Sequence, residues 1–504
     1  MTRAQLRRLS GVVAGSRAAA APGAGIFHLG LGNFHRAHQS VYTSAAVAKR
    51  GGEWGIIGAA SRSATVVSAL RAQEMLYTVV EVSPEGSRFS IPAIHTDVFV
   101  ASRDPGRVVS TIADPAIRIV SLTVTENGYT YSPSTSSLDF RDPLVLHDLS
   151  HRDQPASVIG QIVAGLRRRM ASTGTPLTVM SCDNLAANGH HTKRLVLEFA
   201  AALPSAERED LIPWIEANVS FPSSMVDRIV PSTTDAYRQM VADACGYLDS
   251  IPVPAEPFTM WVVEDRFAAG RPAWETSGVT FSGEVAEYEQ LKVRLLNGTH
   301  SLIAYLGALD ACPTIPDALG HAYIENAARR VLKDEYLPTV RVPSTVDAGD
   351  YEEQLFTRWR NTALGHRTSQ VGSDGSVKLA QRIPEPALTH LEAGRMPHHL
   401  ALTFAAYLCC VAPLPGFEPG PHAAAMEDQA RERLSRFAQA ASGGRDLARG
   451  ALVDLHLLGD KLGQSTEFAD RVGDLIDVIV KYGPRAAAAD VAASHTTDDL
   501  KRSA

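Results

Sequence analysis

The stretch GIFHLGLGNFHRAH, residues 25–38, decides the fold of the first half of this chain. Its first six residues predict a short buried strand, a glycine turn follows, and a helical pattern then runs to about Lys49. This order is what a dinucleotide-binding turn requires, because Gly30 permits a tight turn and Gly32 lets a pyrophosphate approach the backbone. The residues of the turn that we expect to bind a cofactor are Gly30, Gly32, Asn33, Phe34 and Arg36.

Apolar, β-branched runs continue to alternate with helical segments as far as residue 285. Further strands are predicted at Trp54–Ala59, Ile117–Val124 and Leu177–Cys182, with Met75–Val82 and Phe258–Glu264 as additional strands. Strands that are apolar on both faces and alternate with helices indicate a parallel sheet covered by helices. We therefore predict an α/β, Rossmann-type dinucleotide-binding domain over residues 25–285, preceded by a flexible tail over residues 1–24.

The pattern changes near Glu284 to mainly helical segments. These are expected at residues 286–310, 316–336, 398–412, 424–440 and 465–481. The apolar run His399–Leu414 is too short for a membrane span, so it predicts a buried helix. A mainly α-helical substrate and catalytic domain over residues 286–485 follows, and the small, polar residues 486–504 predict a frayed tail.

The composition narrows the class of protein. The net charge of −7 argues against a nucleic-acid partner. Five cysteines without a CxxC pair make a disulfide framework or a cysteine zinc site improbable and fit a reducing cytoplasm. We expect a cytoplasmic protein with a small-molecule substrate, no membrane partner and no metal, existing as a monomer or a small homo-oligomer.

The cofactor turn lacks the third glycine of GxGxxG, where His35 stands. A bare GxG also occurs in ordinary strand-to-helix turns, so the order of strand, turn and helix carries the prediction. An acid at the end of the second strand would favour NAD, whereas Arg62 and its serine neighbours permit NADP. Thr125 and Glu126 end another strand and are expected to contact the cofactor, for which we expect NAD.

The segment EQLKVRLLNGTH, residues 289–300, carries a candidate catalytic set. On a regular helix Asn297 and His300 share a face, with Lys292 about 80° away around the axis. A lysine can take a hydroxyl proton as hydride leaves, an amide such as Asn297 can hold the oxygen, and Glu289 could pass the proton to solvent. The alternative is an exposed Glu–Lys pair beside a polar cap, which the apolar neighbours disfavour.

A second polar segment, SCDN at residues 181–184, lies at the carboxyl end of a predicted parallel strand. Ligands bind at that end of the strands in open α/β sheets, which makes Asn184 a candidate. On spacing alone, an Asx turn that caps a helix explains the segment equally well.

Six ordered segments resemble one family, the polyol-specific long-chain dehydrogenases, which include mannitol 2-dehydrogenase and fructuronate reductase. They are GLGNFHRAH, TVTENGY, SCDN, FPSSMVDRIVP, KVRLLNGTHS and HRTSQVGSDGSVK. The resemblance implies zinc-independent hydride transfer with Lys292 as general base and an oxyanion pair of Asn184 and Asn297. It also implies that His300 positions the substrate and that Glu289 gates the proton path.

Asp227 would lie on the substrate side by the same resemblance, although a salt bridge to Arg228 or Arg266 is its structural alternative. Mannitol 2-dehydrogenases commonly carry an acid where this chain has Ser63, which leaves NADP open.

The segment at residues 366–378 begins with His366-Arg367-Thr368, which looks more like the fructuronate reductase branch than the mannitol branch, whereas Asn127 replaces the lysine typical of the former. It makes His366, Arg367 and Lys378 candidate substrate-binding residues, and Arg367 could pair with a carboxylate or simply hold a loop. Our leading hypothesis is a dehydrogenase that interconverts a linear, mannitol-like polyol and its ketose. The alternatives are a fructuronate reductase that acts on a sugar acid and a nucleotide-binding sensor without turnover, which would not need the complete lysine set.

Overall fold

The structure is a computed structural model that describes residues 13–14, 22–132 and 135–503. The chain divides into two compact units between Ala286 and Glu287. The predicted tail over residues 1–24 lies largely outside the described residues. Two residues of it, Val13–Ala14, form strand β1.

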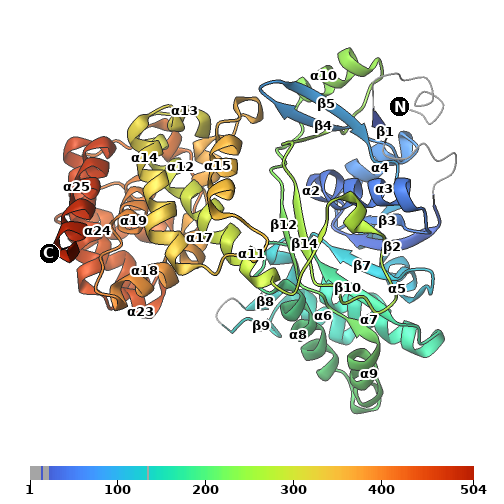
Figure 1. Cartoon of the computed structure of the whole chain (residues 1–504). Helices are drawn as coiled ribbons and strands as arrows, with labels where there is room; N and C mark the ends of the chain where they lie inside the picture. The colour runs from blue at the N-terminus through green and yellow to red at the C-terminus, as the bar shows by residue number, and fades with distance from the viewer. Residues whose placement is uncertain (1–12, 15–21, 133–134, 504) are drawn as a thin grey trace. The chain divides into compact units, whose positions relative to one another are not determined.

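The first unit is built on a six-stranded parallel sheet in the order β11-β10-β7-β2-β3-β6 (Figure 1). Strand β2 lies between β3 and β7, so the strand order reverses beside it. Ligands bind at such a switch point in open α/β sheets, outside the carboxyl ends of the strands. The strands are β2 (Ala24–Leu29), β3 (Gly55–Ala60), β6 (His95–Val100), β7 (Ile119–Leu122), β10 (Leu177–Ser181) and β11 (Val219–Ser220).

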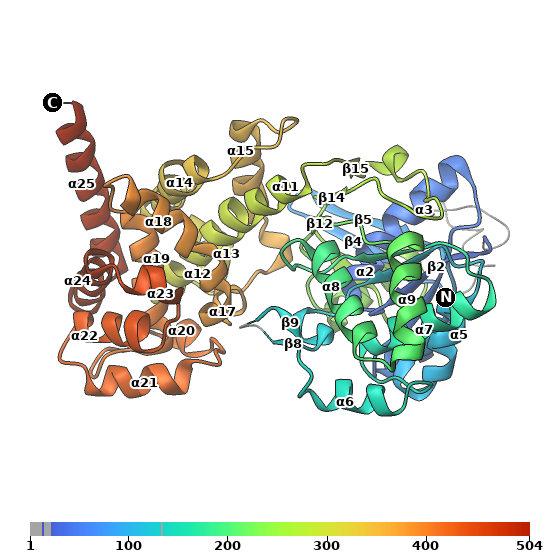
Figure 2. The same ribbon diagram turned by 90° about the horizontal axis from the view of Figure 1, so that it is seen from below.

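Both faces of this sheet are covered, as the apolar runs predicted. Phe27 and Leu29 of β2 pack against a layer of helices on one face. Ile26 points to the opposite face, where it packs in a cluster with Tyr42 and Trp261. The helices of the first layer are α5 (Pro105–Ala113), α7 (Val158–Ser172), α8 (Asn188–Ala201) and α9 (Ser205–Asn218), and Figure 2 shows the last three side by side.

Smaller sheets complete the first unit. One has the order β1-β5-β4-β13, a second β12-β14-β15, and a third pairs β8 with β9. The predicted strands near 75–82 and 258–264 correspond to β4 and β14. Their bounds are β4 (Val79–Ser83), β5 (Gly86–Ile91), β8 (Tyr131–Ser132), β9 (Ser137–Leu138), β12 (Ser224–Asp227), β13 (Val253–Ala255), β14 (Met260–Val263) and β15 (Thr280–Phe281).

The helix after the glycine turn differs from the prediction. Instead of one helix to about Lys49, the chain forms α2 (Asn33–Ala37) and α3 (Gln39–Arg50). His38 separates them with φ −123° and ψ −87°, outside the helical region. The remaining helices of this unit are α4 (Ala64–Ala72), α6 (Pro143–Ser150) and α10 (Asp235–Cys245), with short 3₁₀ turns at Ala101–Arg103, Glu126–Tyr129 and Trp274–Ser277.

The second unit is helical around one large apolar core. Every residue of α19 (His398–Val411) is buried, which confirms the prediction of a buried helix for this run. Its neighbours include α12 (Thr299–Leu309) and α24 (Thr466–Tyr482). The other helices are α11 (Val285–Leu291), α13 (Ile315–Leu319), α14 (Ala322–Arg330), α15 (Ala348–Trp359), α16 (Thr368–Gly372), α17 (Gly375–Arg382), α18 (Pro384–Glu392), α20 (Pro421–Ala424), α21 (Arg431–Ala440), α22 (Gly444–Arg449), α23 (Gly459–Gly463) and α25 (Pro484–Ser503).

Wide π-helical turns and 3₁₀ turns complete the unit. The π segments are Lys292–Gly298, Val331–Tyr336 and Gly450–Asp454, and the 3₁₀ turns are Leu337–Thr339 and Thr362–Leu364. The helices predicted at 316–336 and 424–440 are each interrupted. The frayed tail predicted over 486–504 is instead helix α25, because Ala487 and Val491 are fully buried in the core.

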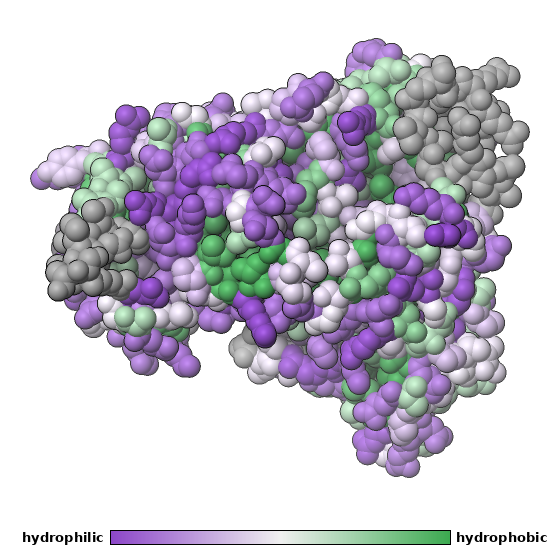
Figure 3. All heavy atoms as spheres, viewed as in Figure 1, coloured by the Kyte–Doolittle hydropathy of each residue, from purple (hydrophilic) through white to green (hydrophobic). Residues whose placement is uncertain are grey.

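Hydrophilic side chains predominate on the face shown in Figure 3, and apolar ones gather in limited patches. Over the described residues, no helix combines the length and the apolar character needed to cross a membrane.

Candidate active site

The glycine turn after β2 has the geometry that a dinucleotide needs. Gly30 has φ +102°, and a Cβ there would lie 2.0 Å from the backbone oxygen of Thr123. The amides of Gly30 and Leu31 both donate to the carbonyl of Ala59, at 2.9 and 3.2 Å. Gly32 is exposed, and a Cβ there would meet only the carbonyl of Gly30, at 3.7 Å. Gly30 is therefore required for packing, whereas Gly32 leaves the backbone open to a ligand.

Arg36, which we expected to bind the cofactor, braces the turn. Its buried guanidinium donates to the carbonyl oxygens of Gly32 (3.3 Å) and Ile251 (2.7 Å) and to Oδ1 of Asn33 (2.5 Å). Burial lowers the pKa of this guanidinium. Phe34 is half-buried and stacks on His38 at 5.0 Å between ring centroids. Arg36 and Asn33 thus hold the turn in shape.

A stack of buried histidines replaces the third glycine of the motif. The ring of His35 lies on that of His28 at 3.4 Å, and Nε2 of His35 hydrogen-bonds Nε2 of His95 at 3.2 Å. His28 also hydrogen-bonds the hydroxyls of Ser121 (2.8 Å) and Thr123 (2.9 Å). Burial lowers the pKa of His28 and of His95 to about 3, and that of His35 well below its usual 6.5. The helix–strand contact that a glycine usually permits is made here by neutral rings.

The end of β3 offers hydroxyl and guanidinium groups without an acid. Ser61, Arg62 and Ser63 are all exposed there. The carbonyl of Ser61 accepts a hydrogen bond from the amide of Ser102 at 3.1 Å, which fixes the loop. The structure therefore leaves the Arg62 side chain accessible to a ribose or its phosphate.

Asp183 holds the loop that carries Thr125 and Glu126. Its carboxylate accepts hydrogen bonds from the amides of Val124 (3.0 Å) and Thr125 (2.9 Å) and from the hydroxyl of Tyr129 (2.8 Å). Thr125 has φ +63°, a strained conformation for a β-branched residue. Burial raises the pKa of Asp183. We did not single out this residue from the sequence, because nothing in its spacing links it to a loop 59 positions away.

Asn188 ties the loop of Asn184 to strand β12. Its side-chain amide donates to the carbonyls of Asp183 (3.0 Å) and Ser224 (2.7 Å) and accepts from the amide of Ser224 (2.9 Å). Asn184 itself is exposed, and Asp227 is buried at the end of β12. One hydrogen-bond network therefore positions three of the predicted segments in this unit.

The arginines considered as partners for Asp227 have other contacts. Arg228 donates to a carboxylate oxygen of Glu81 at 2.7 Å and to backbone carbonyls. Arg266 lies 3.3 Å from Glu264.

The lysine segment of the second unit is a π-helical turn, Lys292–Gly298, between α11 and α12. The 80° offset that we predicted for Lys292 assumed a regular helix and is wrong. In an α-helix residues five apart lie about 140° apart, whereas a π turn closes its hydrogen bonds from i to i+5. The wide turn therefore brings Lys292 and Asn297 to the same face. Lys292 is only 8% exposed, so it is not a surface ion pair.

His300 lies among aromatic and cationic side chains of its own unit. Its ring is 5.9 Å from that of Trp359 and 5.8 Å from that of His366, and its Nε2 is buried without a hydrogen-bond partner among the described residues. Burial holds the pKa of His300 well below 6.5, helped by the positive charges of Arg382 and Arg358. Burial likewise lowers the pKa of His366 to about 4. Both rings are therefore neutral near pH 7.

The remaining predicted residues of this unit lie in different settings. Glu289 is half-buried on α11, one turn before Lys292. Arg367 is exposed, and its backbone begins α16. The ammonium group of Lys378 donates to the carbonyl of Ser373 at 2.7 Å. Among the substrate candidates around residue 366, the ring of His366 lies against that of His300.

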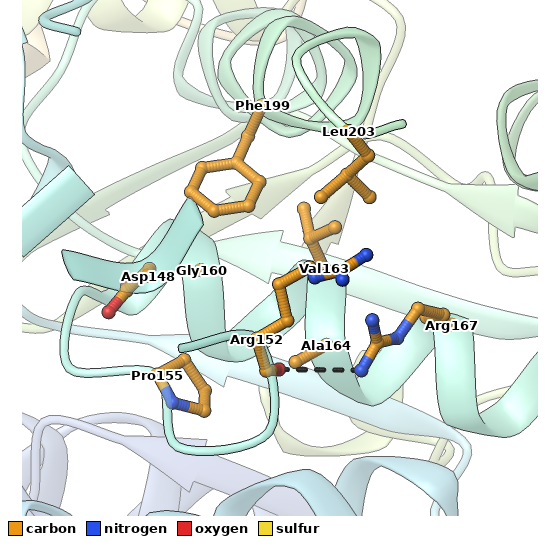
Figure 4. Close-up of a pocket in the computed structure, with 9 residues that line it drawn as sticks. All are labelled: Asp148, Arg152, Pro155, Gly160, Val163, Ala164, Arg167, Phe199 and Leu203. Atoms are coloured by element: carbon orange, nitrogen blue, oxygen red, sulfur yellow. Dashed lines mark hydrogen bonds between the residues drawn. The ribbon is translucent and has the colours of Figure 1, made fainter. Parts of the chain in front are cut away.

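A small cavity in the first unit contains none of the predicted site residues (Figure 4). Phe199 of α8 and Leu203, just after that helix, line one side, and Arg152 and Arg167 line another. Both arginines form ion pairs with Glu207, and the carboxylate of Asp148 accepts the amides of Ala156 and Ser157. The charged groups around the cavity thus have partners within the protein, so we assign the cavity to the packing of α7 and α8. Within the described ranges, no three histidine, cysteine, aspartate or glutamate side chains are grouped so that they could hold a metal ion.

A Rossmann-type unit with an open glycine turn, joined in one chain to a helical unit with a buried lysine, defines a dinucleotide-dependent dehydrogenase. Residues 24–276 match the mannitol dehydrogenase Rossmann domain, and residues 284–472 match the mannitol dehydrogenase C-terminal domain. The chain belongs to the mannitol dehydrogenase family.

Named relatives include both polyol and sugar-acid enzymes. The chain is 40% identical to mannitol 2-dehydrogenase of Cereibacter sphaeroides over 381 residues, which is 75% of this chain and 79% of the relative. It is 39% identical to D-mannonate oxidoreductase of Escherichia coli over 391 residues, 76% of this chain and 79% of the relative. The structure resembles Pseudomonas fluorescens mannitol 2-dehydrogenase in complex with NAD and D-mannitol. The TM-score is 0.84 at 32% identity, covering 97% of this chain and 99% of that one.

Proposed function

We propose that this protein is an NAD(P)-dependent, metal-independent dehydrogenase that interconverts a secondary alcohol of a linear polyol or aldonate with the ketone. The observation that carries the proposal is the buried Lys292 in a π-helical turn that brings it to one face with Asn297. Such wide turns cost regular hydrogen bonding and occur frequently at functional sites.

Lys292 serves as the general base. In its neutral form the amine takes the proton of the substrate hydroxyl, and it returns that proton in the reverse direction. The amide groups of Asn297 and Asn184 donate to the substrate oxygen as negative charge develops on it. Glu289, one turn from Lys292, relays the proton to solvent, and the neutral ring of His300 binds a substrate hydroxyl.

The first unit binds the cofactor through the turn at Gly30 and Gly32, because the open backbone at Gly32 fits a pyrophosphate. When bound, a nicotinamide dinucleotide accepts or returns the hydride. Arg62 and its two serine neighbours supply no acid to repel a 2′-phosphate, so NADP is accepted beside NAD. We propose Thr125 and Glu126 as further contacts, held in place by Asp183.

The same proposal assigns a role to each domain and a cellular location to the protein. Residues 25–285 form the cofactor domain and residues 286–485 the substrate domain. All five cysteines are free and buried, which supports a reducing cytoplasm as the location.

Replacing Lys292 by alanine tests the base. We expect turnover to fall by about 10²- to 10⁴-fold, the usual contribution of a general base, while NADH affinity measured by fluorescence changes less than twofold. Small primary amines added to the variant should restore part of the rate. Lys461→Ala, at an exposed position of α23, is the matched control and should keep wild-type turnover. Wild-type turnover by Lys292→Ala near pH 7 would contradict the assignment.

A substrate screen separates the remaining alternatives. Mannitol, arabinitol, sorbitol, mannonate and tagaturonate are assayed with NAD(H) and NADP(H) in parallel. Turnover of the sugar acids alone identifies a fructuronate-type reductase. NADH binding without turnover of any member of the panel identifies a nucleotide sensor and overturns the proposed function.

A further inference from the structure

The charges that act most strongly on His300 are all positive. They come from Arg358 on α15 and from Lys378 and Arg382 on α17 of the same unit, whereas the ring of His366 is neutral near pH 7. A neutral polyol has no charge to match such a setting, whereas an anionic substrate does.

Among these cationic side chains, Arg382 has hydrogen-bond donors available for a ligand. Its Nη1 donates to the carbonyl of Asn297 at 3.0 Å and to the hydroxyl of Ser301 at 2.7 Å. Its Nε and Nη2 have no hydrogen-bond partner among the described residues, although Arg382 is half-buried. These two nitrogens form one edge of the planar guanidinium, the edge that grips a carboxylate with two parallel hydrogen bonds.

Three buried polar atoms of the same unit also have no hydrogen-bond partner among the described residues. They are Nε2 of His300, the hydroxyl of Tyr336 and Nε1 of Trp359. The Tyr336 hydroxyl packs so closely on Gly298 that a Cβ there would lie 2.5 Å from it. An unsatisfied buried polar group costs about 1–3 kcal/mol, so three together point to a polar ligand that satisfies them.

We propose that Arg382 binds a carboxylate of the substrate, so that a sugar acid is preferred over the corresponding neutral polyol. The proposal rests on the proposed dehydrogenase function and names its substrate class. The guanidinium holds the carboxylate through Nε and Nη2, and the neutral groups of His300, Tyr336 and Trp359 bind hydroxyls of the sugar chain. Asn297 connects this contact to the reacting carbon, because Nη1 of the same guanidinium holds its carbonyl.

Arg367 was the arginine that the sequence offered for this role. It is exposed at the start of α16 and is not among the charges that act most strongly on His300. Arg382 lies fifteen positions further along the chain, and the contact between its guanidinium and Asn297 exists only in the folded unit.

The test compares mannonate with mannitol, which differ at one terminal carbon. We expect wild-type kcat/KM for mannonate to exceed that for mannitol at least tenfold. Arg382→Gln should lower kcat/KM for mannonate about 10- to 100-fold more than kcat/KM for mannitol, the range of a hydrogen bond to a charged group. Both substrates lose the contact between Arg382 and Asn297, and only mannonate also loses the carboxylate contact. Arg382→Lys should lie between. Arg433→Gln, an exposed arginine of α21, is the control and should match the wild type.

Calorimetry of mannonate binding to the full-length protein with NADH gives a readout that does not require turnover. Wild type should bind mannonate at least tenfold more tightly than Arg382→Gln. If neither substrate is turned over but this difference persists, the proposed reaction fails and the carboxylate contact stands. A preference of the wild type for mannitol overturns the carboxylate contact. So does an equal loss for both substrates in Arg382→Gln, or an absence of mannonate binding.

Discussion

The buried histidines beneath the glycine turn predict that the first unit loses stability in mild acid. Burial holds the pKa of His28 and His95 near about 3, whereas an exposed histidine titrates at 6.5. Between these values the unfolded chain binds protons that the folded chain cannot take up. Above pH 6.5 these rings are neutral in both states, and the first unit has its full free energy of unfolding. As the pH falls below 6.5, protons bind to the unfolded chain and this free energy decreases.

The size of the effect follows from the shift. Each histidine costs about 1.4 kcal/mol of stability per pH unit once the pH is well below 6.5. Between pH 7 and pH 5 this amounts to about 2 kcal/mol per ring, or about 4 kcal/mol for His28 and His95 together. That is a large share of the roughly 5–15 kcal/mol by which a domain is normally stable. His35, whose pKa is lowered in the same direction, adds to the loss.

The assay is urea unfolding at pH 7, 6 and 5, followed by tryptophan fluorescence. Four tryptophans, Trp54, Trp214, Trp261 and Trp274, lie in the first unit, so their signal reports it. His95→Gln removes one titrating ring and should lose about 2 kcal/mol less than wild type between pH 7 and pH 5. His190→Gln, at an exposed position of α8, should behave as wild type. An unchanged pH dependence in His95→Gln would refute the reasoning.

Four further substitutions test the cofactor side. Gly30→Ala places a Cβ 2.0 Å from the Thr123 carbonyl, so urea unfolding should show a loss of about 3 kcal/mol or more. Gly32→Ala, whose Cβ has room, should keep stability and weaken NADH binding at least tenfold by fluorescence titration. Asp183→Asn should lower kcat about 10- to 100-fold with NADH affinity within threefold, because it loosens the loop that it holds; unchanged kcat would contradict that role. Arg62→Asp should lower kcat/KM with NADP at least tenfold and leave NAD within threefold, and equal losses would show that the 2′-position is read elsewhere.

The sheet of the first unit was predictable from the sequence because its strands are apolar on both faces. Such runs have few alternatives to a covered parallel sheet, and β2, β3, β7 and β10 lie where the pattern placed them. The break at His38 was not predictable, since the apolar spacing continues through it. At the break, the ring of His38 hydrogen-bonds the carbonyl of Met260, 222 positions away, a contact that spacing along the chain does not reveal.

The second unit shows the limits of periodicity more clearly. Hydrophobic spacing identified a helix through Lys292 and did not reveal its π-helical turn, because the width of a turn is set by backbone hydrogen bonds. Helix α25 was missed because small alanines resemble a flexible tail, although Ala487 is fully buried. Asp183 and Arg382 also escaped notice, since each acts through partners distant in sequence. Lys292 and Asn297, by contrast, could be singled out from the sequence because both lie in one short segment.

The π-helical turn at Lys292–Gly298 has a consequence for how this helix tolerates change in length. The segment accommodates one more residue per turn than an α-helix does, so it behaves as a one-residue insertion in an otherwise regular helix. Deleting one residue there would let the backbone relax into a better hydrogen-bonded α-helix. The same deletion would rotate Lys292 about 100° relative to His300, by the geometry of the α-helix. The deletion would then raise thermal stability and lower the turnover that we attribute to Lys292, although the backbone of the helix would be more regular.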